Sequence, residues 1–132
     1  MPLLVVSQNG VAEQKERDAA IDEQTASRIA AGFVHDGRTY AGTMEDVLYI
    51  QSFGMLAVAQ IVNGSVDGDL RWLDQDNDFT WYDIGGVAVT FDAQGAYNLA
   101  LSAAAHIAAH YRAAQIIKGD AGQSVTTSGH WP

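Results

Sequence analysis

The chain has no cysteine among its 132 residues. Without thiols it can form no disulfide, no cysteine-ligated zinc site and no cysteine nucleophile. Other catalytic motifs are missing too: there is no Gly-x-Ser-x-Gly elbow, no Gly-x-Gly-x-x-Gly and no phosphate-binding loop. No pair of carboxylates stands in an apolar setting. The sequence therefore predicts a protein that is not an enzyme and that uses neither a cofactor nor a catalytic metal.

Basic residues and long apolar runs are also scarce. Seven Lys and Arg stand against sixteen Asp and Glu, which gives a net charge of −9. Nucleic acids and anionic membranes recruit proteins through Lys and Arg, so neither is expected as a partner. The most apolar stretch, residues 47–62, falls short of the roughly 20 residues that span a bilayer. The run at residues 3–6 lacks the basic flank of a signal peptide, so we expect a soluble protein made inside the cell.

What is present is typical of a globular domain, with 48% hydrophobic and 17% charged residues. The local signals predict the α+β fold class: a small single domain with three helices, a short Asp-Gly β-hairpin and a second strand pair. We expect this domain to span residues 13–118. Residues 1–12 are predicted to be an extended N-terminal arm with a turn at residues 9–10, and residues 119–132 a flexible C-terminal tail.

Two turns mark the expected strand pairs. Asp36 and Gly37 separate two short β-prone segments, residues 33–35 and 38–40. Both central positions of a tight hairpin turn need positive φ, which Asp and Gly tolerate. Residues 79–82 and 86–91 are predicted to form the second strand pair around a turn at residues 83–86.

Three segments have the composition and caps of helices. Residues 13–31 carry a thin apolar stripe, so only one side of this helix is expected to contact a partner. Residues 43–62, with Thr43 as the N-cap, are apolar on most sides and are expected to be buried. Asp92 is expected to cap a third helix that ends near residue 118. Its predicted apolar face consists of Tyr97, Leu101, Ala104, Ile107 or Ala108, and Tyr111.

Two histidines on this last helix have the spacing of metal ligands. His106 and His110 stand four residues apart, as two ligands on one helical face do. The glutamate of the metalloprotease motif is missing between them, and no third ligand is evident. We therefore favour helix-surface or interface histidines over a metal site.

An acidic segment has the alternation of a calcium-binding loop. Asp74, Asp76 and Asp78 alternate as calcium ligands do, but an EF-hand needs Gly at its sixth position and Glu at its twelfth. Phe79 and Gly85 stand there instead. The expected structure is a solvated acidic loop, and calcium bound at a subunit interface is the alternative.

Apolar residues at the start of the chain and three aromatic residues further along it are the candidate contacts with other proteins. Trp72 is expected in the core, whereas Trp131 lies near the end of the predicted tail and could anchor in a neighbour's pocket, as tryptophans at interfaces do. The predicted protein-interface residues are Leu3, Leu4, Val5, Val6, Trp81, Tyr82 and Trp131.

Two stretches of the chain carry a family resemblance. The first is Arg17-x3-Ile21-Asp22-x2-Thr25-x3-Ile29-x2-Gly32-Phe33-x-His35-Asp36-Gly37-x2-Tyr40. The second is Trp72-x3-Asp76-Asn77, then Val89-Thr90-Phe91-Asp92-Ala93, then Leu99 and His106. Together they resemble a domain of unknown function that is common in phage tail-fibre and tail-assembly proteins, over residues 14–115. Relatives often have a proline where residues 64–70 stand here, and they are usually attached to longer proteins.

The resemblance implies a location in a virion and carries no catalytic residues. It favours a non-enzymatic structural component of a bacteriophage, made in the host bacterial cytoplasm and placed in the tail, baseplate or tail-fibre attachment. Expected partners are other phage structural proteins and further copies of the chain in a homo-oligomer. Two alternatives stay open: a capsid decoration protein, and a tail-fibre assembly chaperone that leaves before the particle matures.

Overall fold

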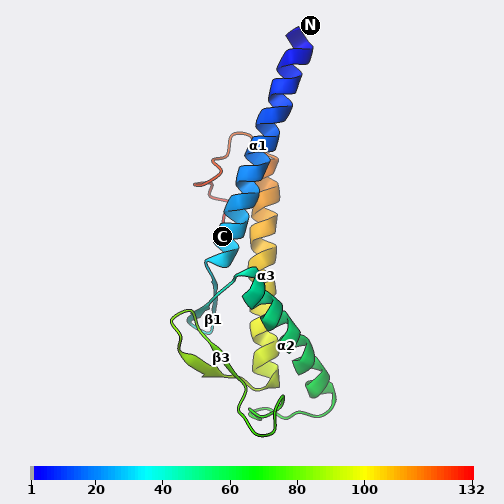
Figure 1. Cartoon of the computed structure of the whole chain (residues 1–132), viewed down its shortest axis with the longest axis vertical. Coiled ribbons are helices and arrows are strands. Elements are labelled where there is room, and N and C mark those ends of the chain that lie inside the picture. Colours follow the sequence, from blue (N-terminus) through cyan, green and yellow to red (C-terminus); the bar gives the residue numbers. More distant parts are fainter. Residues whose placement is uncertain (1) are drawn as a thin grey trace. The chain divides into compact units, whose positions relative to one another are not determined.

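The computed structural model describes residues 2–132, and for residues 2–9 it describes the backbone only. Three helices and two antiparallel strand pairs confirm the predicted α+β fold class (Figure 1). The elements are α1 (Pro2–Ala30), β1 (Phe33–His35), β2 (Arg38–Tyr40), α2 (Met44–Val62), β3 (Thr80–Tyr82), β4 (Ala88–Thr90) and α3 (Ala93–Lys118). The chain divides into two compact units: Ile29–Ile107, and Met1–Arg28 together with Ala108–Pro132.

The β1–β2 hairpin forms where the Asp-Gly turn predicted it. Asp36 has φ 48° and Gly37 has φ 75°, so both turn residues occupy the left-handed region that a two-residue hairpin requires. The register pairs Phe33 with Tyr40. Both side chains are almost fully buried, and their rings stack with centroids 5.9 Å apart. The hairpin thus delivers two aromatic rings to the core.

The β3–β4 pair confirms the second predicted hairpin. Trp81 pairs with Val89 across it. Asp83 organises the turn, because its Oδ1 accepts hydrogen bonds from the backbone N–H groups of Gly85 (3.0 Å) and Val87 (2.9 Å). An aspartate that binds nearby backbone donors in this way is typical of a turn.

Both predicted helix caps are present. Thr43 precedes α2 and its hydroxyl oxygen accepts from the N–H of Asp46 (3.2 Å). Asp92 precedes α3 and accepts from the N–H of Gly95 (2.7 Å) through Oδ1, and from the N–H of Gly68 (2.8 Å) through Oδ2. Each cap satisfies a backbone donor that a helix start leaves without an intrahelical partner. Asp92 in addition ties the 63–79 connection to the start of α3.

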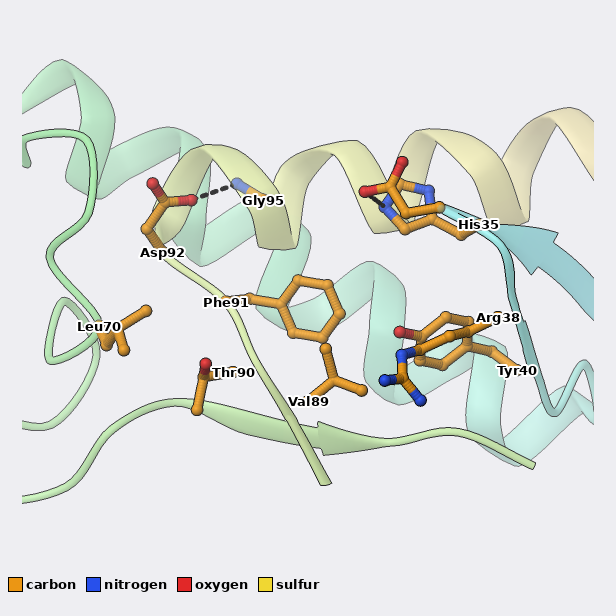
Figure 2. A pocket seen from close by; sticks show the side chains of 10 residues that line it. His35, Arg38, Tyr40, Leu70, Val89, Thr90, Phe91, Asp92 and Gly95 are labelled. Atoms are coloured by element: carbon orange, nitrogen blue, oxygen red, sulfur yellow. Dashed lines mark hydrogen bonds and ion pairs between the residues drawn. The ribbon is translucent and has the colours of Figure 1, made fainter. Parts of the chain in front are cut away.

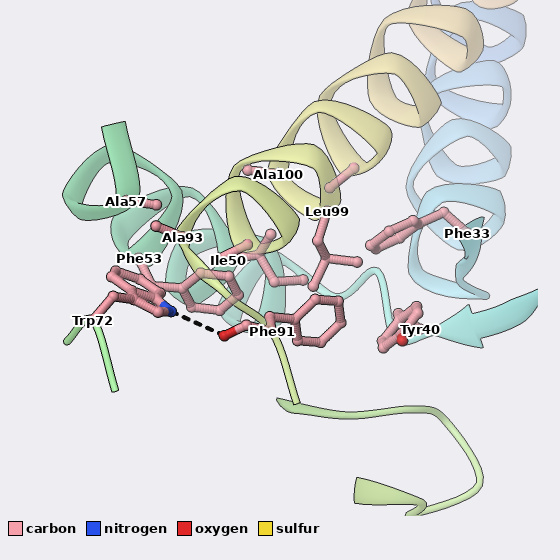
Figure 3. Packing of buried hydrophobic residues seen from close by; sticks show 12 residues of the cluster. Phe33, Tyr40, Ile50, Phe53, Ala57, Trp72, Phe91, Ala93, Leu99 and Ala100 are labelled. Carbon is pink, nitrogen blue, oxygen red and sulfur yellow. Dashed lines mark hydrogen bonds between the residues drawn. The ribbon is translucent and has the colours of Figure 1, made fainter. Parts of the chain in front are cut away.

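The core of unit Ile29–Ile107 is rich in aromatic rings (Figure 3). Trp72 is buried as predicted, and its Nε1–H donates to the carbonyl of Phe91 (2.9 Å). Gly54 of α2 lies so close to α3 that a Cβ there would stand 2.5 Å from the Cβ of Ala100. The buried cluster comprises Phe33, Tyr40, Ile50, Phe53, Ala57, Trp72, Phe91, Ala93, Ala96, Leu99, Ala100 and Ala103.

The other unit has its own small core around Trp131. The buried residues are Ile21, Ala113, Ala114, Ile117 and Trp131. The indole Nε1–H donates to the carbonyl of Val125 (3.0 Å), and the Arg28 guanidinium lies 4.8 Å from the ring centroid. Arg17 reinforces the packing by donating to the carbonyls of Ile117, Asp120 and Gln123.

The predicted flexible tail is therefore wrong. Residues 119–132 fold back on α1 and the end of α3, and only 8% of the Trp131 side chain is exposed (Figure 1). Two physical causes explain the docking: burial of a large indole, and side-chain hydrogen bonds such as that from Ser128 Oγ to Gln123 Oε1 (2.7 Å). Composition rich in Gly, Ser and Thr predicted flexibility but gave no sign of these contacts.

The extended N-terminal arm is also corrected, because α1 begins at Pro2 and continues through Asn9 and Gly10 without the predicted turn. Proline is favoured at a first helical position, since it has no N–H to leave without a partner there. Extending an existing helix costs less than starting one, so the strong helix formers that follow carry the helix through two weak positions.

Candidate functional site

Helix α2 is exposed over much of its surface, contrary to the prediction that it is buried. Its buried residues are Ile50, Phe53, Gly54 and Ala57, which share one side of the helix. The unit supplies only α3 and two short hairpins to cover it. A helix that is apolar on most sides therefore leaves apolar side chains in contact with water.

Five of the seven large apolar residues exposed on α2 lie in one row, which we call the α2 stripe; Tyr49 and Leu56 lie outside it. Its members are between 43% and 90% exposed: Met44, Leu48, Met55, Val58 and Val62. With Gln51 included, successive positions alternate steps of four and three residues. This is the spacing of a coiled-coil seam, in which a row of side chains faces one partner helix.

Part of the apolar face predicted for α3 also lies on the surface, although Tyr97 packs against the core cluster. Leu101 is 49% and Tyr111 57% exposed, whereas the core is made by Ala96, Leu99, Ala100 and Ala103. The sequence predicted which residues share this face and did not decide whether it is buried, because α3 has alanine on nearly every side. Small residues occupy the core positions of α3 because they allow α2 and α3 to approach closely.

A shallow groove of about 110 Å³ joins the two exposed faces. In Figure 1 the first half of α3 runs beside α2, and the side chain of Gln51 bridges them by donating to the carbonyl of Ala100 (3.0 Å). Gly54 lets α3 approach α2 closely here, because Ala100 occupies the space that a side chain at this position would need. The groove is lined by Gln51, Gly54, Met55, Val58, Tyr97, Ala100, Leu101 and Ala104. The α2 stripe, Tyr97, Leu101 and Ala104 are together called the α2–α3 surface.

Charge is distributed around this surface and not along it. Residues 93–111 contain no Asp, Glu, Lys or Arg, and in α2 the only charged residues are Glu45 and Asp46 in its first turn. Unit Ile29–Ile107 nevertheless holds ten Asp and Glu against two Arg, a net charge of −8 out of −9 for the chain. The α2–α3 surface is thus an uncharged apolar strip on a strongly acidic body.

Two of the predicted interface residues come together at β3. Trp81 is half-buried and packs against Phe53, with ring centroids 5.2 Å apart, so it serves the core as well as the surface. Tyr82 is 59% exposed. Both line a pocket of about 330 Å³ with Asp46 and Ile84. This aromatic pocket is a second surface on which a partner could be bound.

The remaining predicted interface residues are Trp131 and residues 3–6. Trp131 is covered by its own chain, so its ring is not free to anchor in a neighbouring subunit. Leu3, Leu4, Val5 and Val6 lie outside the residues whose side chains the structure describes. Sequence reasoning missed the α2–α3 surface, although the alternating steps of four and three in residues 44–62 carried its signal.

A polar pocket of about 340 Å³ lies between the first hairpin and the start of α3 (Figure 2). Its lining includes His35, Arg38, Tyr40 and Asp92. Burial is the main cause that raises the pKa of Tyr40 above its usual value, so its hydroxyl stays protonated at neutral pH. Arg38 is directed to Asp83, with 3.1 Å between Nη1 and Oδ2. The charged groups here already have partners within the chain.

Beside this pocket, the side chains of Ser102, His35 and Asp36 lie in a row, in the order of a catalytic triad. His35 Nδ1 lies 2.6 Å from Ser102 Oγ, and His35 Nε2 lies 3.5 Å from Asp36 Oδ2. In a catalytic triad the aspartate is buried and orients the imidazole, whereas the Asp36 side chain is 91% exposed in a turn. Ser102 lies outside the pocket lining. The arrangement fastens the hairpin to α3.

The two histidines predicted as possible ligands have separate environments. The His106 ring packs on Phe33, with centroids 6.0 Å apart, and its Nε2 lies 3.1 Å from the carbonyl oxygen of Ile29. His110 is only 5% exposed and stacks on Trp131. The prediction of surface or interface histidines is thus wrong for His110, which is buried by the docked C-terminal segment.

The acidic loop at residues 74–78 binds its own chain. Asp74 accepts from the N–H of Asp76 (2.9 Å) and from the side-chain amide of Asn77 (2.8 Å), and Asp78 pairs with Arg71. The hydrogen bond from Asp76 is the main cause that lowers the pKa of Asp74. Within the described residues, no group of three or more His, Asp or Glu side chains converges as metal ligands do.

Comparison with known proteins gives one finding about the chain's relatives. No curated protein and no solved structure matches it. Among the helices in the described residues, none has the length and apolar character needed to cross a bilayer. One family model matches residues 12–128, which includes both exposed faces described above. The chain therefore belongs to the family defined by the domain of unknown function DUF4376.

Proposed function

We propose that this protein is a non-enzymatic structural component of a bacteriophage virion that works through contacts with other proteins. The observation that carries this proposal is the α2–α3 surface. Soluble monomers rarely expose large contiguous apolar patches, and those that do use them as interaction sites. Five apolar side chains in one row, all at least 43% exposed, are such a patch.

Covering the α2 stripe would supply substantial binding free energy. Full burial of a large aliphatic side chain contributes about 1.5–3 kcal/mol. Since the stripe's members are already partly covered, about half of that value applies to each. Part of the sum is lost to the entropy of association. Five such contributions, about 4–8 kcal/mol together, are of the same order as that cost, so a specific complex also needs contacts beside the stripe.

The location in a phage particle rests on the resemblance of residues 14–115 to a domain common in tail-fibre and tail-assembly proteins. It favours the tail, the baseplate or the attachment of tail fibres, with other phage structural proteins as partners and several copies of the chain per particle. A capsid decoration protein and a fibre-assembly chaperone use the same kind of apolar surface. Copy number in the particle separates these three functions.

The test is quantitative mass spectrometry of purified particles of the phage that encodes the chain, scaled to the major capsid protein. A few to some tens of copies per particle would support the tail location. Hundreds of copies would make the protein a capsid decoration protein. Absence from particles, with the protein present in infected cells, would contradict a virion component and favour the chaperone.

A further inference from the structure

We infer that the α2–α3 surface binds an amphipathic helix of another protein, and that Lys or Arg residues flank the apolar stripe of that helix. This inference rests on the proposed function, in that it takes the surface to be covered by a protein. It goes further by giving the shape and the charge of the segment that covers it.

The shape of the surface fits a helix. From Met44 to Val62 the α2 stripe runs for about 27 Å at 1.5 Å per residue, which is five helical turns. Its steps of four and three residues match the repeat with which a second helix would place its own side chains. The groove, whose lining includes Met55 and Leu101, can accept one apolar side chain of the partner. A strand or a flat sheet offers no such periodic match.

The carboxylates at the two ends of the α2–α3 surface indicate which charges a bound helix carries beside its apolar stripe. Glu45 lies in the first turn of α2 next to Met44, whereas Asp46 lines the aromatic pocket on another side of the helix. Asp67 and Asp69 follow its last turn, in a loop that the Gly68–Asp92 hydrogen bond fixes at the start of α3. Both ends of the apolar strip thus carry carboxylates, and no lysine or arginine lies along it. Cations on a bound helix would be attracted at either end.

The same charges disfavour a second copy of the chain as the occupant. Unit Ile29–Ile107 has a net charge of −8. Pairing two such units through α2 would bring their carboxylates to a shared rim, and like charges beside a helical seam select against that pairing. A basic amphipathic helix meets the same apolar surface without this repulsion.

The experiment uses the full-length chain and three synthetic three-heptad peptides. One has leucine at the seam positions and lysine beside them, the second replaces lysine with glutamate, and the third scrambles the lysine peptide. Fluorescence anisotropy of labelled peptide measures Kd. We expect the lysine peptide to bind about tenfold or more tightly than either control, with an affinity that falls as salt rises.

Charge-neutral variants locate the binding site. Met55→Gln and Leu101→Gln, both at exposed positions of the surface, should weaken binding of the lysine peptide about tenfold while circular dichroism shows an intact fold. Val66→Gln is the matched control, because Val66 is 68% exposed and outside the surface. Affinity for this variant should not change.

Three results would overturn the inference. The first is that the lysine and glutamate peptides bind equally tightly. The second is that the Met55→Gln and Val66→Gln variants have equal affinity for the lysine peptide. The third is that the chain associates with itself in sedimentation velocity and that Met55→Gln abolishes this association. The last would show that a second copy occupies the surface. If the lysine peptide does not bind and the protein is present in virions, only this inference is contradicted. Peptide binding by a protein absent from virions would contradict only the proposed function.

Discussion

Replacing Trp131 with alanine should destabilise the unit formed by Met1–Arg28 and Ala108–Pro132. The indole is 8% exposed and packs against Ile21 and Ile117. Truncating a buried tryptophan to alanine typically costs about 3–5 kcal/mol. The nearby Arg28 guanidinium adds about 0.5–1 kcal/mol through its contact with the ring. Since a terminal segment can partly relax, we expect a loss of about 3 kcal/mol.

Two further variants divide that loss into its causes. Trp131→Phe keeps an aromatic ring and loses the hydrogen bond to the Val125 carbonyl, so it should cost about 1–2 kcal/mol. His130→Ala alters an exposed neighbour and should change stability by less than about 0.5 kcal/mol. Urea unfolding followed by far-UV circular dichroism measures all three. A loss below about 1 kcal/mol for Trp131→Ala would refute the docked C-terminal segment.

Three other perturbations test the fold. Gly54→Ala should lower the thermal midpoint, because its new methyl group would meet Ala100 at 2.5 Å and overpacking costs about 1–3 kcal/mol; Gly10→Ala, at an exposed helical position with no atom nearby, should instead stabilise by up to about 1 kcal/mol. Equal effects of these two changes would contradict the close contact of α2 and α3. Asp92→Ala should cost about 1–2 kcal/mol in urea unfolding, since it removes the α3 cap and the bond to Gly68; a loss under about 0.3 kcal/mol would contradict the capping role. The pKa of Asp83 is lowered, chiefly by the N–H of Val87, so its contribution to stability is complete above the usual value of about 3.9 and is lost as pH falls through the lower folded pKa. Carbon-13 NMR titration of its carboxyl group checks this, and a midpoint at or above the usual value would count against the turn geometry.

Features set by neighbouring residues were predictable from the sequence. The turn at Asp36-Gly37 and the caps at Thr43 and Asp92 each depend on a few adjacent positions. Local propensity dominates there, and no distant partner is needed to form them. These signals were sufficient to establish the α+β class and the order of its elements.

Features that depend on which apolar surfaces meet were not predictable in the same way. On α3 the bulky residues Leu101 and Tyr111 look like a core face, yet the alanines on the other side are buried because they let α2 come close. The docking of Trp131 depends on contacts with Ile21, about 110 residues away in the chain. The composition of residues 119–132 shows many small residues, but it does not show that Trp131 contacts a residue as distant as Ile21.

The absence of cysteine from the chain allows a direct test of the central claim, that another protein covers the α2–α3 surface inside the particle. The Met55→Cys variant puts a single thiol in the middle of the α2 stripe, and Val66→Cys puts one on an exposed loop outside it. Maleimide labelling is then compared between the free protein and purified particles that carry each variant. We predict that both thiols react in the free protein and that only the Met55→Cys thiol is protected in particles. Equal reactivity of the Met55→Cys thiol in both states would contradict the account.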